Sequence, residues 1–343
     1  MNKLTHWIKG HQITAFFIIT FAITWGLGFS YGAAQVKGIV WLYPVASLAT
    51  CGPALAGIII TALTNTQPRE GTKRTYWIAF FVAWGVIVLV WLAHRTFIDH
   101  APSSPVLVGF TLVLVVPVAF VISMAYSRIP TVKGYLASLF RLRGVGGWSL
   151  LALVLQLGLV LLSIPISSLL GRQPIAAHQF PGTGLALIGL IAVKFLYQFF
   201  FFNATGEEAG WRGFALPRMQ SLTSPLVACL VMNIVWALWH LFFWMAEGRP
   251  ISSPEYWAQT YLELLPGTVT LGWLYNRSKG SILVAGIAHA AANTAFAFFP
   301  NLDWPVFNWT VAAAALVMIV VDRMWKKLPS DHPAVYQDPV LEG

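Results

Sequence analysis

Long apolar runs separated by short polar stretches dominate the chain. A helix needs about 20 mostly apolar residues to cross the hydrocarbon layer of a membrane, and runs of this kind recur from one end of the sequence to the other. The pattern predicts an all-α, polytopic integral membrane protein with about ten transmembrane helices. The predicted spans are Thr14 to Tyr31, Val40 to Ala62, Tyr76 to Leu92, Pro105 to Tyr126, Trp148 to Leu170, Gly184 to Asn203, Pro225 to Met245, Trp257 to Tyr275, Ser281 to Phe299 and Pro305 to Val321.

Polar residues inside these runs need a partner or a function, because an ionisable side chain at the centre of a membrane helix costs roughly 2.5 to 3.5 kcal/mol. The eighth span contains Glu263, Pro266 and Gly267 and is the weakest of the ten. Lys194 lies near the middle of the sixth span. We expect Lys194 and Glu263 to form an ion pair.

Composition agrees with this pattern. Of the 343 residues, 57% are hydrophobic and 10% are charged, and the mean hydropathy is +0.70, whereas soluble proteins are about a quarter charged. The net charge of +9 does not indicate nucleic acid, since the basic residues lie in short loops between apolar runs. Cys51 and Cys229 lie far apart in apolar segments. They indicate neither a disulfide framework nor a cysteine metal motif.

The positions of Lys and Arg predict the orientation, because short cytoplasmic loops are enriched in both. In the ten-span arrangement most of the 21 basic residues fall on one side, and the opposite side has only Lys37, Arg95, Arg172 and Arg249. Both termini are therefore expected in the cytoplasm. The basic loop of residues 127–147 fits either an interfacial helix on anionic headgroups or an ordinary cytoplasmic loop. The polar residues 328–343, with three prolines, predict a disordered tail.

The segment GEEAGWRGFALPRM, Gly206 to Met219, places scarce charge at the end of the sixth apolar run. On an α-helix Glu207 and Glu208 point about 100° apart, whereas Glu208 and Arg212 lie four residues apart on one face. One carboxylate can then form an ion pair with the arginine, while the other remains available for catalysis. Glu207 is the candidate general base, since partial desolvation favours the protonation range that proton abstraction requires.

Four further polar residues lie within apolar runs. His240, in WALWH, is expected to share a water molecule with Glu207 or to deliver a proton to the leaving amine. His289 and Asn293, in HAAAN, lie four apart on one helical face and can both donate to one oxygen, as an oxyanion site requires. Asn233, seven residues before His240, is the weakest candidate for this interior.

The positions of the two histidines along their helices argue against a shared site. At a rise of about 1.5 Å per residue, His240 lies roughly 24 Å along its span and His289 about 12 Å along its own. We therefore expect an irregularity: a tilted or late-starting seventh span, or a segment from Trp211 to Thr223 within the membrane region.

Structural interpretations of the same residues remain open. The two glutamates also fit solvated acids at the end of a span, His240 fits a buried histidine among aromatic residues, and His289 with Asn293 fits polar packing between helices beside small residues. Two histidines and a carboxylate are also a common zinc set, which would be Glu207, His240 and His289, but the close HExxH spacing is absent. No cofactor is favoured, and zinc is the alternative.

EEAGWR, WALWH and HAAAN resemble the three motifs of the CPBP family, the CAAX proteases and bacteriocin-processing (Abi) membrane proteins. The resemblance covers about residues 184–300, and the family usually has Phe where this chain has Trp236. It implies an α-helical membrane endopeptidase, described in the family both as a metalloprotease and as a glutamate-type protease. The positions that match the motifs are Glu207, Glu208, Arg212, His240, His289 and Asn293.

The sequence therefore predicts an N-terminal transmembrane extension (1–183), a catalytic core (184–300), a last transmembrane helix (301–327) and a polar tail (328–343). The predicted activity is hydrolysis of a peptide bond in a membrane-associated, CAAX-like or prenylated substrate, with Glu208 and Arg212 in support. The expected location is a bacterial plasma membrane, with the lipid bilayer as a partner and no nucleic acid. A bacteriocin-immunity or partner-binding protein without proteolysis is one alternative, and a proton-coupled transporter is another.

Overall fold

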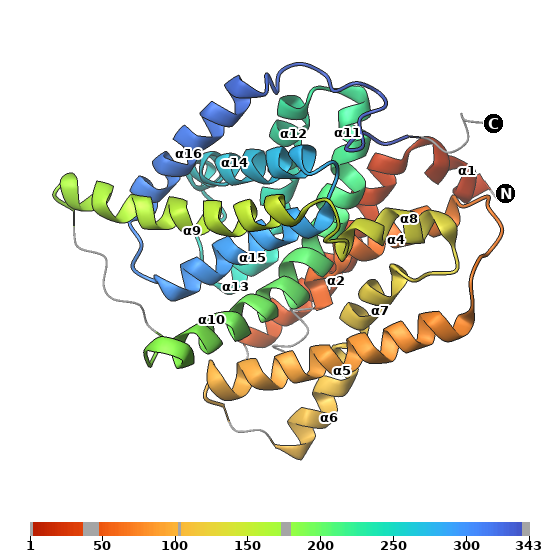
Figure 1. Ribbon diagram of the computed structural model, residues 1–343, viewed down its shortest axis with the longest axis horizontal. Coiled ribbons are helices and arrows are strands. Elements are labelled where there is room, and N and C mark those ends of the chain that lie inside the picture. Colours follow the sequence, from red (N-terminus) through yellow and green to blue (C-terminus); the bar gives the residue numbers. More distant parts are fainter. Residues whose placement is uncertain (1–2, 37–47, 102–103, 173–179, 338–343) are drawn as a thin grey trace. The chain divides into compact units, whose positions relative to one another are not determined.

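The computed structural model describes residues 3–36, 48–101, 104–172 and 180–337, and within these ranges every regular element is a helix. The predicted all-α class is confirmed (Figure 1). The chain divides into two compact units: Met1–Arg141 with Phe180–Trp211, and Leu142–Gln179 with Arg212–Gly343. Each unit thus combines segments from distant parts of the chain. The predicted boundary between extension and core at residue 183 remains a prediction.

The first unit packs α2 against α4, α5 against α7 and α10, and the π-helical segment η3 against α4 and α7. Its elements are α1 (Lys3–Gly10), α2 (Gln12–Val36), α4 (Gly52–Leu63), α5 (Lys73–Phe97), α6 (Pro105–Leu114), α7 (Val116–Met124), α8 (Pro130–Leu136), η2 (Ala137–Leu139), α10 (Gly184–Gln198) and η3 (Phe199–Glu208).

The second unit packs α15 against α9, α12 against α14, and α16 against α9 and α14. Its elements are α9 (Gly146–Leu169), η4 (Trp211–Ala215, which begins at the last residue of the first unit), α11 (Leu216–Leu222), α12 (Pro225–Trp239), α13 (Leu241–Ala246), α14 (Pro254–Arg277), α15 (Ile282–Phe298) and α16 (Trp304–Val321).

Most of the predicted spans coincide with apolar helices. Among the described residues, six are long and apolar enough to cross a membrane: Gln12–Ser30, Lys73–Phe97, Pro105–Met124, Gly146–Leu169, Gly184–Leu222 and Trp304–Val321. Three shorter apolar helices are Gly52–Leu63, Pro225–Trp239 and Ile282–Phe298. The second predicted span begins outside the described residues, at Val40. The eighth coincides with α14, which is helical but is not among these nine segments.

Local sequence explains where many helices begin. The side chains of Ser104, Ser224, Ser253 and Ser281 each accept a hydrogen bond from the backbone N–H three residues later, at the starts of α6, α12, α14 and α15. Serine is a preferred N-cap for this reason. A proline follows the cap in α6, α12 and α14, where its missing N–H costs nothing.

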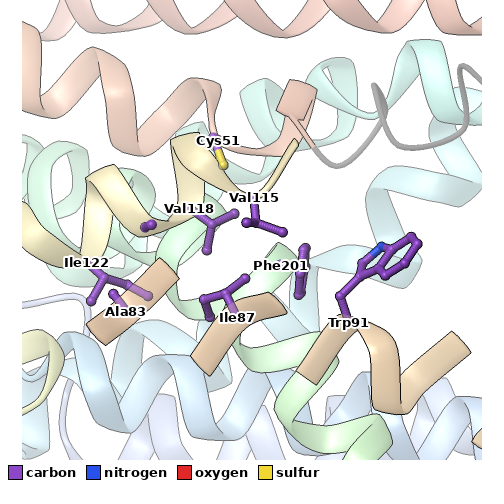
Figure 2. Close-up of a cluster of buried hydrophobic side chains, with 9 residues drawn as sticks. Cys51, Ala83, Ile87, Trp91, Val115, Val118, Ile122 and Phe201 are labelled. Carbon is purple, nitrogen blue, oxygen red and sulfur yellow. The ribbon is translucent and has the colours of Figure 1, made fainter. Parts of the chain in front are cut away.

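A buried apolar cluster holds the first unit together (Figure 2). It joins α5, α7 and η3 through side chains such as Ile87, Val118 and Phe201. Cys51 belongs to this cluster and is 0% exposed, and Cys229 in the second unit is 1% exposed. Neither cysteine is part of a disulfide bond, in agreement with their interpretation as small apolar residues.

Two apolar clusters hold the second unit. One joins α9 with α14 and α15, and the other joins α9 with α15 and α16. In addition, Asn233 on α12 donates to the carbonyl of Tyr261 (2.8 Å) and accepts from Thr268 Oγ1 (2.8 Å). These bonds lie on either side of Pro266, whose ring removes a backbone hydrogen bond inside α14. Asn233 therefore links α12 to α14.

Lys194 and Glu263, which were expected to form an ion pair, lie in different units, and each has a polar partner within its own unit. Lys194 Nζ lies 3.2 Å from Nε2 of His94, whose Nδ1 lies 3.4 Å from a carboxylate oxygen of Asp99. Glu263 instead accepts a hydrogen bond from Gln259 one turn earlier in α14 (2.8 Å). The half-buried lysine is thus stabilised within the first unit by the imidazole of His94, which sequence reasoning did not select.

The expectation of disorder after residue 327 is wrong for the described part. Residues 328–337 follow a defined path, and Ala334 and Val335 are 0% and 7% exposed. The last six residues of the predicted tail lie outside the described ranges. The basic loop of residues 127–147 contains α8 and η2, and Val132, Leu136 and Leu139 bury their side chains completely.

Candidate active site

The two glutamates lie at the end of η3, a π-helix in the first unit. Glu207 is 5% exposed and Glu208 is 0% exposed, so the interpretation of both as solvated acids is wrong. In a π-helix the backbone hydrogen bond joins residues five apart. The 100° α-helical separation assumed from the sequence therefore does not apply to this segment. Such segments are rare and occur frequently at functional sites.

Glycines let this segment lie directly against α4. A Cβ atom built on Gly206 would lie 2.9 Å from the carbonyl oxygen of Thr50, and one on Gly210 would lie 2.3 Å from the carbonyl carbon of Pro53. Real Cβ atoms essentially never come this close to backbone. The GEEAG sequence thus gives two buried carboxylates with a glycine on either side to fit them against the neighbouring helix.

Side chains also bind the carbonyl groups of this irregular backbone. Thr50 Oγ1 donates to the carbonyl of Phe201 (3.0 Å), and the hydroxyl groups of Tyr135 and Thr205 donate to Ala209 and Phe200. Buried backbone groups require such partners. The π-helical form is therefore fixed by side-chain hydrogen bonds from α8, from the residues just before α4, and from within η3.

In the second unit, Trp236 lies between three of the predicted site residues. Its ring lies 5.2 Å from the ring of His240 and 5.5 Å from the ring of His289, both in edge-to-face geometry. The guanidinium carbon of Arg212, which is 1% exposed, lies 5.2 Å from the centre of a Trp236 ring. The structure thus brings Arg212, His240 and His289 together around an indole ring. We call these four residues the Trp236 cluster.

His240 has a defined tautomer. It lies at the C-terminal end of α12, where backbone carbonyls lack the usual helical donors. Its Nδ1 lies 2.7 Å from the carbonyl oxygen of Trp236. A carbonyl can only accept, so Nδ1 carries the hydrogen, and in the neutral ring Nε2 keeps its lone pair. The ring also stacks on Trp244, with centroids 5.2 Å apart. His240 is therefore an oriented base or hydrogen-bond acceptor.

His289 is 7% exposed in α15, and Asn293 lies one turn further along the same regular helix. The spacing of four residues places both on one helical face, as the sequence predicted. The rings of His240 and His289 both contact the Trp236 ring, so the difference in depth estimated for straight helices does not keep them apart. α12 ends at His240, where a new helix, α13, begins. This break differs from the expected irregularity, a tilted or late-starting seventh span or a segment from Trp211 to Thr223 within the membrane region, which stays a prediction; α12 begins at Pro225, where the predicted span does.

Sequence reasoning missed the central position of Trp236, which it noted only as a departure from the family pattern. The i, i+4 spacing to His240 was a usable signal. It also placed Asn233 in the active interior, whereas both ends of this amide bind α14.

No group of three or more His, Cys, Asp or Glu side chains suited to a metal ion occurs among the described residues. Within the second unit, the Trp236 cluster offers two imidazoles, and Nδ1 of one is engaged by a carbonyl. Zinc sites commonly need at least three protein ligands. The Trp236 cluster by itself therefore does not fit zinc, and the set of Glu207, His240 and His289 stays a prediction.

The fold and these residues define a class: a helical integral membrane protein that buries carboxylates, imidazoles and a guanidinium in apolar helices. Residues 185–295 match the family model described as Type II CAAX prenyl endopeptidase Rce1-like. The chain therefore carries an Rce1-like CAAX prenyl endopeptidase family domain, which confirms the resemblance drawn from EEAGWR, WALWH and HAAAN.

A curated relative supports the same assignment. The chain is 29% identical over 167 residues to "CAAX prenyl protease 2" of Methanococcus maripaludis. The alignment covers 47% of this chain and 60% of the relative, so the chain matches less than two thirds of that protein's length.

Proposed function

We propose that this protein is an intramembrane endopeptidase that hydrolyses a peptide bond of a membrane-associated, CAAX-like or prenylated substrate. The observation that carries the proposal is the Trp236 cluster, with the fixed tautomer of His240. The family domain at residues 185–295 supports the same reaction class. The orientation with both termini in the cytoplasm and the location in a bacterial plasma membrane belong to this proposal.

In the proposed reaction, Glu207 takes a proton from water, and the water oxygen attacks the scissile carbonyl carbon. His240, whose Nε2 lone pair is available in the neutral ring, orients that water and assists proton transfer to the leaving amine. His289 and Asn293 donate hydrogen bonds to the carbonyl oxygen as it gains negative charge. Collapse of the tetrahedral species breaks the C–N bond, and the amine leaves with the transferred proton.

Glu208 and Arg212 have supporting roles in this proposal. Arg212 lies against the Trp236 face, where a cation–π contact out of water contributes up to about 2 kcal/mol. The two imidazoles meet the same indole in edge-to-face geometry. Arg212 is thereby expected to orient the ring that separates the two histidines.

The experiment compares Glu207→Gln and His289→Ala with Glu255→Gln and His11→Ala, whose side chains are exposed. Each purified variant is assayed in detergent with a membrane-tethered prenylated CAAX peptide and the same peptide without its prenyl group. We expect kcat/KM to fall 10²- to 10⁴-fold in the first pair, the usual size of an acid–base contribution, and to change less than twofold in the controls.

Full activity in both Glu207→Gln and His289→Ala would remove the mechanism. Metal analysis and activity after chelation decide between the water mechanism and its zinc-dependent form. One zinc ion per chain, together with loss of activity on chelation, would favour the zinc-dependent mechanism. A bacteriocin-immunity role without proteolysis predicts that protection from the toxin persists in both variants.

A further inference from the structure

The segment that follows α16 packs on α11. Residues 329–336, which we call the strap, run beside α11 in the second unit (Figure 1). The backbone N–H of Tyr336 donates to the carbonyl of Pro217 (3.0 Å), and Nε2 of Gln220 donates to the carbonyl of Ala334 (2.9 Å). Ala334 is 0% exposed. Main-chain groups of the strap are thus bound by α11.

Arg218 adds a contact between rings. Its guanidinium carbon lies 3.5 Å from the centre of the Phe214 ring and 3.8 Å from that of Tyr336. Nη1 donates to the carbonyl of Phe214 (3.0 Å). Arg218 is only 8% exposed, and a buried guanidinium is stabilised by aromatic faces on which it can stack. Tyr336 supplies one of these two faces, so the strap completes the environment of a buried cation.

The strap also reaches the end of α14. A Cβ atom on Gly280 would lie 2.8 Å from the carbonyl oxygen of Pro333, and the φ of Gly280 is +78°. Gln220 and Asn276 exchange two amide hydrogen bonds, of 3.0 and 2.8 Å. The strap therefore connects α11 with the turn between α14 and α15, the helix that carries His289.

α11 depends on such contacts, because it has only seven residues. Helices this short are not stable through their own hydrogen bonds. α11 continues directly from η4, which carries Arg212. Movement of α11 would therefore move the guanidinium that contacts Trp236.

We propose that the strap is a positioning element for the active site: it fixes α11 and, through α11, the placement of Arg212 against Trp236. Arg218 and Tyr336 are the positioning residues, and neither touches substrate. This role for the strap in catalysis rests on the proposed peptidase function, whereas its effect on the order of α11 does not.

The test uses the full chain with Tyr336→Leu, Tyr336→Phe and, as a matched control, Trp325→Leu. Trp325 follows α16 as well and is 50% exposed. For each variant, the hydrogen-exchange rates of the backbone amides of residues 216–222 are measured, and kcat and KM are determined separately. We expect Tyr336→Leu to raise exchange in α11 at least tenfold and to lower kcat at least fivefold with KM nearly unchanged. Tyr336→Phe, which keeps the ring, and the control should resemble the original protein.

Gly280→Ala serves as a second variant, because it displaces the strap from the α14 side without altering α11. It should raise exchange in α11 as Tyr336→Leu does. Unchanged exchange in both variants would overturn the proposal whether or not the protein is a peptidase. Faster exchange with unchanged kcat would overturn the positioning role. A protein with no peptidase activity in any form, but with faster exchange in Tyr336→Leu, would contradict the proposed function and leave the strap as an anchor of α11 only.

Discussion

His332 is the residue on which the strap's response to pH depends. Its Nδ1 accepts the backbone N–H of Ala334 (3.1 Å), which only an unprotonated Nδ1 can do. Burial lowers the pKa of His332; the nearby carboxylate of Asp331 opposes this effect, and the charge of Lys279 adds to it. The folded form therefore binds fewer protons than the unfolded form. The contribution of His332 to the stability of the fold is complete above the pKa of the unfolded chain, about 6.5. It declines as the pH falls toward the lower pKa of His332 in the folded form.

We predict that acidification from pH 7 to pH 5 lowers the protection factors of α11 amides, after correction for intrinsic exchange rates. His332→Asn offers an amide oxygen that accepts the same N–H and does not titrate. It should remove this pH dependence. An equal loss of protection in His332→Asn would show that another group is responsible.

Sequence reasoning selected His240 and His289 correctly as neighbours, because scarce imidazoles in apolar helices rarely lie there without a partner. It did not predict the partners of Asn233 and Lys194. Their partners, a carbonyl of α14 and the imidazole of His94, depend on which helices are adjacent. Helix adjacency is not encoded in the spacing within a single apolar run.

At the scale of the element, the apolar runs predicted most helices, since length and hydropathy determine what can lie in a bilayer. The π-helical form of η3 and η4 was not predictable in this way. Hydropathy does not distinguish an α-helix from a π-helix, and the choice depends on contacts from other segments, such as Thr50 and Tyr135. The break between α6 and α7 has a local signal, Pro117, near the start of α7.

The close fit of η3 to α4 gives a prediction for two glycines of the same helical run. Gly210→Ala places a methyl group against the backbone of Pro53, and such overpacking costs about 1 to 3 kcal/mol. A Cβ on Gly189 meets nothing within 4 Å. We expect a lower thermal unfolding midpoint in detergent and reduced peptidase activity for Gly210→Ala, and neither change for Gly189→Ala. Equal midpoints for the two variants would argue against this packing.

At the scale of the whole molecule, hydropathy established an integral membrane protein, but it did not indicate how the chain divides. Each compact unit combines segments from both sides of residue 180 in the sequence. Such a division arises from packing between distant segments, which one sequence read in order does not reveal. The sequence also suggested a disordered tail, because its polarity and prolines do not reveal that Ala334 and Val335 are buried in the folded protein.

The distribution of basic residues predicts the orientation of the second unit in the membrane. Lys326, after α16, belongs to the basic side, and Ser252, before α14, belongs to the opposite side; both are exposed. We expect a membrane-impermeant maleimide to label Ser252→Cys in intact cells and Lys326→Cys only after the membrane is opened. The reverse pattern would invert the proposed topology.

Such labelling is specific for the engineered cysteine, because Cys51 and Cys229 are buried. A reagent must touch sulfur to react, and neither native sulfur is accessible while the protein stays folded. Labelling therefore reports the exposure of the engineered cysteine alone, without the need to replace the native cysteines. On heating, reaction of the two native cysteines would measure the unfolding of the helices around them.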